Sequence, residues 1–476
     1  MRVLMFGWEF PPHISGGLGT ACKGIVDALG VRGDTSTIFV VPKVFGNENA
    51  QNTVFAGADQ YVEKHKEILN RHVRVLLPKD YNPELSKFDS RAEHLIYVET
   101  ASFLHPYMQP LQIERILLKK HINPEKVFVN PTGHLVTIDK GKPRPIKFSP
   151  SELRTDSKQP KFEFTGRYTP ELLTETGMFA RVGAQIAEQH NFNVIHAHDW
   201  LTYEAGIAAK ESTGKPLVVH VHATEYDRCG ENVNPQVFSI EQHGMEQADA
   251  VITVSNLTRD TVIDKYGIDP DKVFTIYNGV DFKPDRKKYK KPEGEKLVTF
   301  LGRVTYQKGP RYFIEAAYKV LQHSKNVRFV MAGGGDMLNE MIIAAARLGI
   351  SDRFHFTDFL NHDEVRHLLA VSDIYVMPSV SEPFGIAPLE AVRSNVPVII
   401  SKQSGVAEVL QHAFKVDYWD SDSIADAIHA LITYPSLSRY FIKNAREEVK
   451  RLKWDISARQ IAEVYNIVCN KKKSEP

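Results

Sequence analysis

Short apolar runs alternate with longer amphipathic stretches along most of this chain. That alternation is typical of βαβ units, in which helices connect the parallel strands of one sheet. The first half contains predicted strands at residues 3–6, 37–41, 73–77, 95–98, 194–196, 217–221 and 250–254. The second half contains predicted strands at residues 298–301, 327–332, 354–357, 374–377 and 396–400. The pattern predicts an α/β protein with doubly wound parallel sheets.

The segment 282–295, FKPDRKKYKKPEGE, interrupts the alternation because it is rich in Lys, Pro and Glu and has no apolar face to bury. We therefore predict two Rossmann-like domains, at residues 1–285 and 286–455. Residues 456–476 are predicted to form a C-terminal helix that packs back on the first domain and ends in a frayed tail. The proline-rich stretch 101–170 is interpreted as an insertion into the first domain.

The charge balance limits the classes of partner. The chain of 476 residues carries 59 Lys and Arg against 58 Asp and Glu, a formal net charge of +1. Nucleic acids and membrane surfaces favour strongly basic proteins, so neither is an expected partner. An anionic ligand must therefore be held by local charges.

The cysteines and the N-terminus suggest a compartment. The chain has three cysteines that lie far apart in the sequence, Cys22, Cys229 and Cys469. Their wide spacing and odd number argue against a disulfide framework or a structural zinc site. The first residues run directly into a predicted strand without the features of a signal peptide, and no apolar run is long enough to cross a membrane. We expect a cytoplasmic protein without an integral membrane segment.

A glycine-rich loop, Ser15-Gly16-Gly17-Leu18-Gly19, follows the first predicted strand and precedes a helical stretch. Glycines let a ligand approach the backbone, and the free N–H groups at a helix start attract anions. The spacing differs from the dinucleotide GxGxxG pattern, so NAD is not expected. A tight strand–helix turn without a ligand is the alternative interpretation.

Histidines follow two neighbouring predicted strands. His196, His198 and Asp199 come after one strand, and His220 and His222 come at the end of the next. Ligands bind at the carboxyl ends of strands in open α/β sheets, so these side chains could share one polar pocket. Two His at alternate positions are weak evidence for zinc, and buried histidines satisfied by the protein remain an alternative.

The loop after the first strand of the second half carries two positive charges. Arg303 and Lys308 lie between Gly302 and Gly309. A diphosphate can be held by such a pair, with Arg as a planar donor fork and Lys as a point charge. A solvated pair on a surface loop is the alternative. A second glycine loop around Gly334 could admit a base or a ribose.

The segment 381–391, SEPFGIAPLEA, is the most specific feature. Pro383 and Gly385 predict a sharp turn, and a helix begins near Pro388 and continues past Glu390. Glu382 and Glu390 stand eight residues apart, so they cannot form a local ion pair. An acidic residue that merely stabilises a helix N-terminus is the alternative.

Six segments in this order resemble the retaining glycosyltransferases of the GT-B fold, in particular family 4 and the glycogen and starch synthases. They are FGWEFPPHISGGLG, HAHDW, YNGVD, LGRVTYQKG, AGGGD and SEPFGIAPLEA, spread over residues 1–400. The resemblance implies an acceptor-side first domain, a second domain that binds a nucleotide sugar, and a central cleft that both domains face.

The resemblance also implies roles for individual residues. The implied catalytic residues are His198, Arg303, Lys308 and Glu382, with His198 at the transferred sugar and the two cations at the donor diphosphate. The implied substrate-binding residues are Gly16, Gly17, Asp199, His222, Gly334, Gly385, Ile386 and Glu390, of which Glu390 contacts the ribose. Such enzymes retain anomeric configuration and use neither a metal nor a cofactor, the nucleotide sugar being a substrate.

One departure concerns the donor. Bacterial glycogen and starch synthases usually carry Lys two residues before the paired glycines, where this chain has Ile14. ADP-glucose and UDP-glucose therefore both stay open. We expect transfer of glucose to an α-glucan, as in glycogen biosynthesis. The alternatives are another acceptor (a surface polysaccharide, a small molecule or a lipid), a sugar-nucleotide epimerase, and an inactive nucleotide-sugar-binding protein.

Overall fold

The computed structural model describes residues 1–12, 16–60, 127–129, 135–139, 142–145, 164–168, 172–280 and 294–474. Ile14, the predicted strands 73–77 and 95–98, most of the predicted insertion and almost all of the predicted linker lie outside these residues. The chain divides into two compact units. One unit comprises residues 1–41, 45–56 and 183–476 and holds both large parallel sheets; the other comprises residues 42–44 and 57–182.

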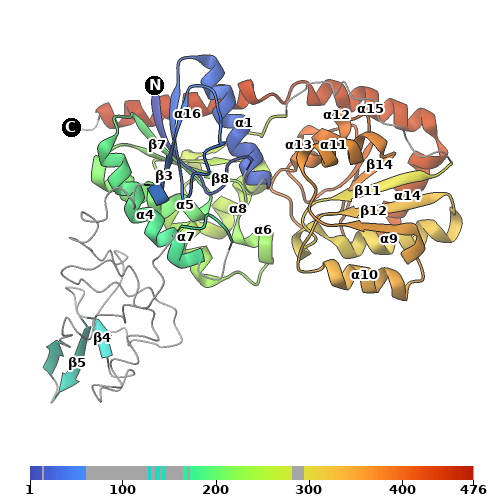
Figure 1. The fold of residues 1–476 in the computed structure, drawn as a ribbon, viewed down its shortest axis with the longest axis horizontal. Coiled ribbons are helices and arrows are strands. Elements are labelled where there is room, and N and C mark those ends of the chain that lie inside the picture. Colours follow the sequence, from blue (N-terminus) through green and yellow to red (C-terminus); the bar gives the residue numbers. More distant parts are fainter. Residues whose placement is uncertain are drawn as a thin grey trace. The chain divides into compact units, whose positions relative to one another are not determined.

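The first parallel sheet has seven strands in the order β10-β9-β8-β7-β1-β2-β3 (Figure 1). Its strands are β1 (Arg2–Phe6), β2 (Ser36–Val41), β3 (Thr53–Gly57), β7 (Val194–His198), β8 (Leu217–Val221), β9 (Ala250–Thr253) and β10 (Val273–Thr275). β1 pairs in parallel with both β2 and β7. The chain order thus reverses at β1, because β2 lies on one side of it and β7 on the other.

The second parallel sheet has six strands in the order β13-β12-β11-β14-β15-β16. They are β11 (Lys296–Leu301), β12 (Val327–Ala332), β13 (Phe354–Thr357), β14 (Ile374–Met377), β15 (Val398–Ser401) and β16 (Phe414–Val416). All neighbouring pairs are parallel. The order is that of the Rossmann fold, with the reversal between β11 and β14. Two Rossmann-like domains are therefore confirmed.

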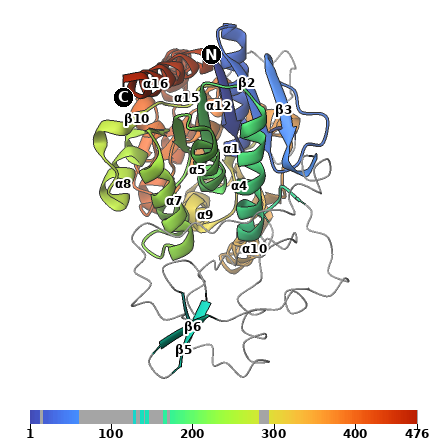
Figure 2. The ribbon, with the colours of Figure 1, turned by 90° about the vertical axis from the view of Figure 1, so that its left-hand side faces the viewer.

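Helices connect the strands of both sheets (Figure 2). In the first domain they are α1 (Gly17–Arg32), α4 (Leu172–Gln189), α5 (Trp200–Thr213), α6 (Glu225–Cys229), α7 (Pro235–Gln247), α8 (Asn256–Tyr266) and the 3-10 turn η2 (Pro270–Lys272). In the second they are η3 (Tyr306–Lys308), α9 (Pro310–His323), α10 (Leu338–Arg347), η4 (Ser351–Arg353), α11 (His362–Val371), α12 (Ile386–Arg393), α13 (Val406–Val409), α14 (Ser421–Thr433) and α15 (Pro435–Val449).

Alternate residues of the central strands enter two different cores. In β14, Ile374 and Val376 belong to a cluster built with α9 and α14, whereas Tyr375 and Met377 belong to one built with α12 and α15. Successive side chains of a strand point to opposite faces of the sheet. A strand buried on both faces reads as a continuous apolar run, and the sequence predicts β14 with its observed bounds for that reason.

The last helix, α16 (Trp454–Ser474), packs against α1 of the first domain (Figures 1 and 2). A Cβ on Gly24 would lie 2.2 Å from the Trp454 ring, so the small residue permits this contact. The Tyr465 hydroxyl lies 2.6 Å from His196 Nδ1 beneath the helix. The domain limits at 285 and 455 stay predictions.

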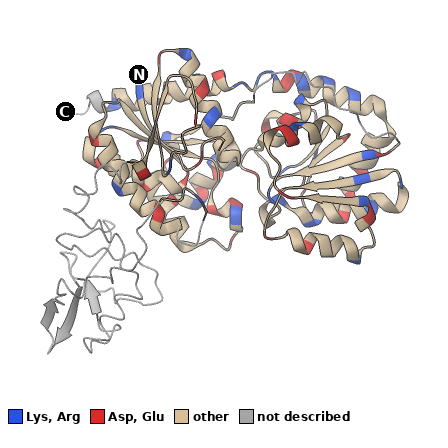
Figure 3. Ribbon diagram, in the orientation of Figure 1, with Lys and Arg blue, Asp and Glu red and all other residues tan. Residues whose placement is uncertain are grey.

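The second unit contains a small antiparallel sheet within the predicted insertion. Its strands are β4 (Val127–Val129), β5 (Leu135–Asp139) and β6 (Lys142–Pro145). In the described residues no helix combines the length and hydropathy that crossing a bilayer requires. Basic and acidic residues are interspersed along the ribbon of both parallel-sheet domains, consistent with the small net charge (Figure 3).

Candidate functional site

The carboxyl ends of β11 and β14 meet at the reversal point of the second sheet. Ligands of open α/β sheets bind in the crevice outside this point, because the loops from the two strands diverge there. The loop after β11 carries Arg303 and Lys308, and the loop after β14 carries Glu382 and Gly385. The sheet order therefore brings four of the predicted site residues to one edge.

Close backbone packing holds these two loops together. Gly309 has φ 64°, and a Cβ there would lie 2.0 Å from the Pro378 carbonyl oxygen. The Val380 N–H donates to the Gln307 carbonyl at 2.8 Å. Gly309 is thus required both for its left-handed conformation and for the close approach. Because it follows η3 directly, it fixes Lys308 against the loop after β14.

Lys308 and Glu382 form an ion pair. Their side chains are only 20% and 10% exposed, so the pair is largely removed from water. The Ser379 hydroxyl donates to the same Glu382 carboxylate at 3.3 Å. The Glu382 backbone is held by Gln403 O and Gly405 N, at 3.0 and 2.9 Å. The carboxylate is therefore positioned by contacts on several sides.

Arg303 is exposed, and its guanidinium has no hydrogen-bond or ion-pair partner in the part of the chain that the structure describes. It is therefore available to an anion at the same strand end. The neighbouring glycine loop has a structural reason for its composition. A Cβ on Gly333 would lie 2.0 Å from Gly302 O, and one on Gly335 would lie 2.2 Å from Val304 O. At Gly334 the nearest atom is Asp358 Oδ1 at 2.7 Å.

The start of α12 forms the other wall of this edge. Gly385 is its N-cap with φ 101°, a conformation that favours glycine, and no side chain caps the helix. Ile386 is the first helical residue, so its N–H has no partner within the helix. Burial raises the pKa of the Glu390 carboxyl, and Arg393 opposes this effect. The Glu390 carboxylate accepts no hydrogen bond from the described residues.

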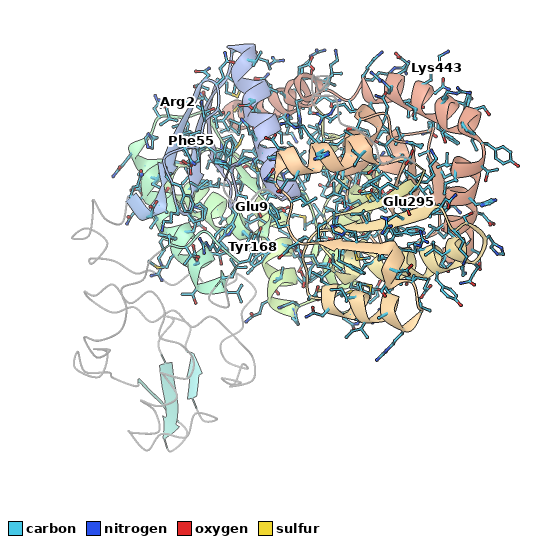
Figure 4. All side chains as sticks on the ribbon, turned by 45° about the vertical axis from the view of Figure 1, so that its right-hand side comes forward. Arg2, Glu9, Phe55, Tyr168, Glu295 and Lys443 are labelled. Atoms are coloured by element: carbon cyan, nitrogen blue, oxygen red, sulfur yellow. The ribbon has the colours of Figure 1, made fainter. Side chains whose placement is uncertain are left out.

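The first sheet repeats the arrangement at the reversal between β1 and β7. Gly16 is the N-cap of α1, and Gly17 is its first residue, with open space where a Cβ would stand. Glu9 lies beside this helix start, and its carboxylate accepts from the Gly16 N–H at 3.3 Å (Figure 4). An anion bound at these N–H groups would compete with Glu9, a residue that the sequence reasoning did not single out.

The structure corrects the position of His198. The predicted strand 194–196 ends at His196, whereas β7 continues through His198; β8 has its predicted bounds, 217–221, which include His220. These three imidazoles are at most 1% exposed. His198 Nδ1 and His222 Nε2 are hydrogen-bonded at 2.9 Å. Burial lowers the pKa of His222 to about 3 and that of His198 well below its usual value, so both are neutral near pH 7.

Asp199 connects the ends of β7 and β8. It is the N-cap of α5 with φ 58°, and its carboxylate accepts from the backbone N–H groups of His222 and Ala223 at 2.7 and 3.3 Å. Burial raises its pKa to about 7, partly offset by Arg228. The observed contacts of Asp199 are thus with the protein, where they fix the loop that carries His222.

Several hydrogen bonds join the parallel-sheet domains within their common unit, and two of the acceptors are the carboxylates of Asp227 and Glu408. Asp227 of α6 accepts a hydrogen bond from the Ser381 hydroxyl, one residue before Glu382. Glu408 accepts from the N–H groups of Asn256 and Leu257 at 3.0 and 2.8 Å, at the start of α8. Sequence reasoning missed both contacts. Thr224 and Asp227 form a capping box, and that spacing is a signal in the sequence.

The predicted residues therefore fall into two groups. Lys308 and Glu382 are in contact, as are His198 and His222. Among the described residues no hydrogen bond or ion pair connects the histidine pair directly to the ion pair. The ion pair lies at the reversal point of the second sheet, and the histidine pair lies at the carboxyl ends of β7 and β8 in the first sheet.

Known proteins are similar to this chain in sequence. The sequence model described as "Glycosyltransferase Family 4" matches residues 149–283, and the one described as "Glycosyl transferases group 1" matches residues 281–448. An uncharacterized glycosyltransferase of Methanocaldococcus jannaschii is 32% identical over 296 residues, which cover 58% of this chain and 75% of the relative. The chain belongs to the family 4 glycosyltransferases.

Characterised relatives of this glycosyltransferase act in different reactions. The alpha-maltose-1-phosphate synthase of Mycolicibacterium smegmatis is 29% identical, over 58% of this chain and 79% of that protein. The glycogen synthase of Mycobacterium tuberculosis is 27% identical, over 57% of this chain and 68% of that protein. Family membership therefore fixes the class of enzyme and leaves the acceptor open.

Solved structures share the fold of the glycosyltransferase. Sucrose-phosphate synthase of Thermosynechococcus elongatus has a TM-score of 0.63 at 16% identity and covers 98% of both chains. Anabaena HepE, solved in complex with UDP-glucose, has a TM-score of 0.60 at 18% identity and covers 98% of this chain and 99% of its own. The predicted GT-B fold is confirmed.

Proposed function

We propose that this glycosyltransferase moves glucose from a nucleotide diphosphate sugar to an α-glucan, with retention of anomeric configuration and without a metal or cofactor. One observation carries the proposal. The buried Lys308–Glu382 pair and the unpartnered Arg303 stand together at the reversal point of the second sheet. A nucleotide-sugar donor bound at this point needs two cations for its diphosphate and a carboxylate near its sugar.

Donor binding must change the anionic partner of Lys308. Glu382 neutralises Lys308 in the structure, so a diphosphate replaces one anionic partner of Lys308 with another. Arg303 adds a second charge, and as a planar fork it suits phosphate oxygens. As the glycosidic bond breaks, negative charge accumulates on the leaving diphosphate, and fixed cations in a partly dry site stabilise it. Arg303 and Lys308 thus supply the charge that a metal supplies in other transferases.

The first sheet provides the sugar side of the proposal. His198 is neutral because burial lowers its pKa, so its ring can exchange hydrogen bonds with sugar hydroxyls without adding charge. Gly16 and Gly17 offer N–H groups at the start of α1, and Gly385 and Ile386 do so at the start of α12. With retention, the departing phosphate oxygen takes the acceptor's proton on the face where the new bond forms.

The relatives support a glucosyl donor and leave its nucleotide open. HepE is solved with UDP-glucose, and glycogen synthase is among the relatives. A different acceptor is the second candidate, favoured by relatives described as D-inositol 3-phosphate glycosyltransferases.

A donor screen tests the proposal. Nucleotide release is measured from ADP-glucose, UDP-glucose and other sugar nucleotides, each with and without glycogen. We expect glycogen-dependent release from one glucose donor and an α-linked product by NMR. Release that never depends on a glucan would remove the glycogen synthase interpretation. A β-linked product would overturn retention.

A further inference from the structure

Four histidines form a compact cluster on one face of the first sheet. His196 and His198 alternate along β7, His220 lies in β8 directly opposite His198, and His222 is the first residue after β8. The ring centroids of His196 and His220 are 5.4 Å apart, as are those of His198 and His220. The family resemblance implies roles for His198 and His222 and gives His196 and His220 no role.

Three of these rings keep buried nitrogens that have no hydrogen-bond partner in the described chain. They are Nε2 of His196, Nε2 of His198 and both nitrogens of His220. A buried polar atom without a partner costs roughly 1–3 kcal/mol, so proteins rarely keep several together without a reason. One ring nitrogen from each of the three residues lies within 4.8 Å of the others. This spacing permits convergence on one ion after small side-chain shifts.

The other nitrogens of two rings are already fixed. His196 Nδ1 is hydrogen-bonded to the Tyr465 hydroxyl at 2.6 Å, and His198 Nδ1 to His222 Nε2 at 2.9 Å. Such outer contacts orient an imidazole and leave its second nitrogen for a metal. We propose that His196, His198 and His220 form a binding site for a transition-metal dication of the zinc class.

The ligand set suits a dication of this class. Metals bind the neutral imidazole, and three histidines with one open position are an established zinc geometry.

A second triad, formed by Cys22, His198 and His222, also brings its ligand atoms within 4.8 Å of one another. A metal there would break the His198–His222 hydrogen bond. It would also need a thiolate, whereas burial and the nearby carboxylates of Asp199 and Glu9 raise the pKa of the Cys22 thiol well above its usual value. The all-histidine triad is favoured because it avoids both costs.

A metal bound at this triad occupies His198 Nε2, so that this nitrogen can no longer contact the donor sugar. The ion therefore inhibits transfer. This consequence rests on the proposed function. Sequence reasoning gave zinc little weight because it counted two histidines on one strand, and His220 joins them only through the parallel pairing of β7 and β8.

Cobalt binding to the nucleotide-free full chain tests the site without reference to transfer. Cobalt(II) chloride is titrated into the protein and the visible spectrum is recorded, followed by competition with zinc. We expect one ion per chain with intense tetrahedral bands, displaced by zinc and lacking a thiolate charge-transfer band. Absence of these bands in the wild type overturns the proposal.

Variants identify the ligands. His220→Ala and His196→Ala should each weaken cobalt affinity at least about tenfold, since even second-shell losses cost 10–100-fold. Cys22→Ser is the matched control and should bind as the wild type does. Thermal melts show which variants fold. Two alanine variants are used so that the test still stands if one of them does not fold. A thiolate band that Cys22→Ser abolishes would overturn the all-histidine site in favour of the second triad.

Zinc inhibition completes the test. Micromolar zinc should reduce glucosyl transfer, a chelator should restore it, and Cys22→Ser should respond like the wild type. Cobalt binding without any transferase activity would contradict the proposed function alone. Active enzyme that binds no cobalt would contradict the metal site alone.

Discussion

Lys308 and Glu382, separated by 74 residues in sequence, form an ion pair beyond the carboxyl ends of the central strands of the second parallel sheet. They come from loops after β11 and β14, which are neighbours because the chain order reverses between these strands. The pair is therefore a consequence of Rossmann topology, and it places a cation where a nucleotide phosphate is expected.

Replacing Lys308 with alanine should abolish most transfer while the protein still folds. Loss of one preorganised group that stabilises developing charge costs roughly 10²–10³ in kcat. Lys319→Ala is the matched control, because Lys319 pairs with Asp422 on the surface of the same domain. Steady-state kinetics and a thermal melt are compared for both variants. Equal kcat/KM for Lys308→Ala and wild type would contradict the assigned role.

Replacing Gly385 with alanine should reduce both stability and activity. Its φ of 101° is unfavourable for alanine, at roughly 1–3 kcal/mol, and the new Cβ would lie 3.2 Å from Glu382 Cγ. Gly349→Ala is the control, since its φ is 67° and nothing lies within 4 Å of the added Cβ. Urea unfolding should show destabilisation in both variants, whereas only Gly385→Ala should lower kcat. Loss of activity in both would show that strain alone explains the effect.

The histidine cluster should make the protein labile to acid. Burial lowers the pKa of His196 and His222 to about 3, below the ordinary value of 6.5, so the unfolded chain binds more protons between these limits. The free energy of unfolding should then fall as pH decreases below about 6.5, by roughly 1.4 kcal/mol per histidine and pH unit. Asp199 acts oppositely between about pH 4 and 7, because burial raises its pKa to about 7.

Burial also raises the pKa of other carboxyls, among them Glu241 and Glu390, so the net slope is the difference between these groups and the four histidines whose pKa is lowered. We expect the histidines to dominate between about pH 6.5 and pH 4.5. Urea denaturation from pH 7.5 to pH 4.5 measures the slope. His196→Asn should make the slope shallower, and Asp199→Asn should make it steeper. A stability that stays constant over this range would contradict the neutral buried cluster.

Removing the Ser381 hydroxyl should affect transfer modestly. It donates to Asp227 of the first domain and precedes Glu382. A hydrogen bond to a charged group contributes about 1.5–3 kcal/mol, so Ser381→Ala should lower kcat/KM roughly tenfold if the contact positions Glu382 during transfer. Ser438→Ala, which loses a bond to Leu431 O at 2.8 Å elsewhere in the second domain, is the control. Unchanged kinetics in Ser381→Ala would exclude that positioning role.

Much of the fold could be predicted because its central strands are buried on both faces. The runs at 327–332 and 374–377 coincide with the central strands β12 and β14. The run at 354–357 coincides with β13, although that strand lies at the sheet edge and is partly exposed. The strands β10 and β16 were missed, since three residues leave too short a pattern. The strand β3 was missed because it lies at a sheet edge and is half exposed, so its apolar run is weak.

The candidate site could be predicted only as separate loops. Glu382 and Lys308 were each placed at a strand end, but their contact depends on strand order, which local sequence does not encode. His196 was placed in the predicted strand 194–196, but its contact could not be predicted, because Tyr465, whose hydroxyl it meets, lies 269 residues later in the chain. Gly333 and Gly335 serve loop packing, which no local pattern reveals.

Equilibrium binding of the nucleotide tests the central claim most directly. UDP and ADP are titrated by calorimetry into the wild type and the Arg303→Ala/Lys308→Ala variant, with Arg311→Ala/Lys319→Ala as the charge-matched control. We predict that the wild type and the control bind one of the two nucleotides equally well and that the site variant binds it at least about tenfold more weakly, as loss of charge-assisted bonds to phosphate requires. Equal affinity in all three proteins would contradict the assignment of the donor diphosphate to Arg303 and Lys308.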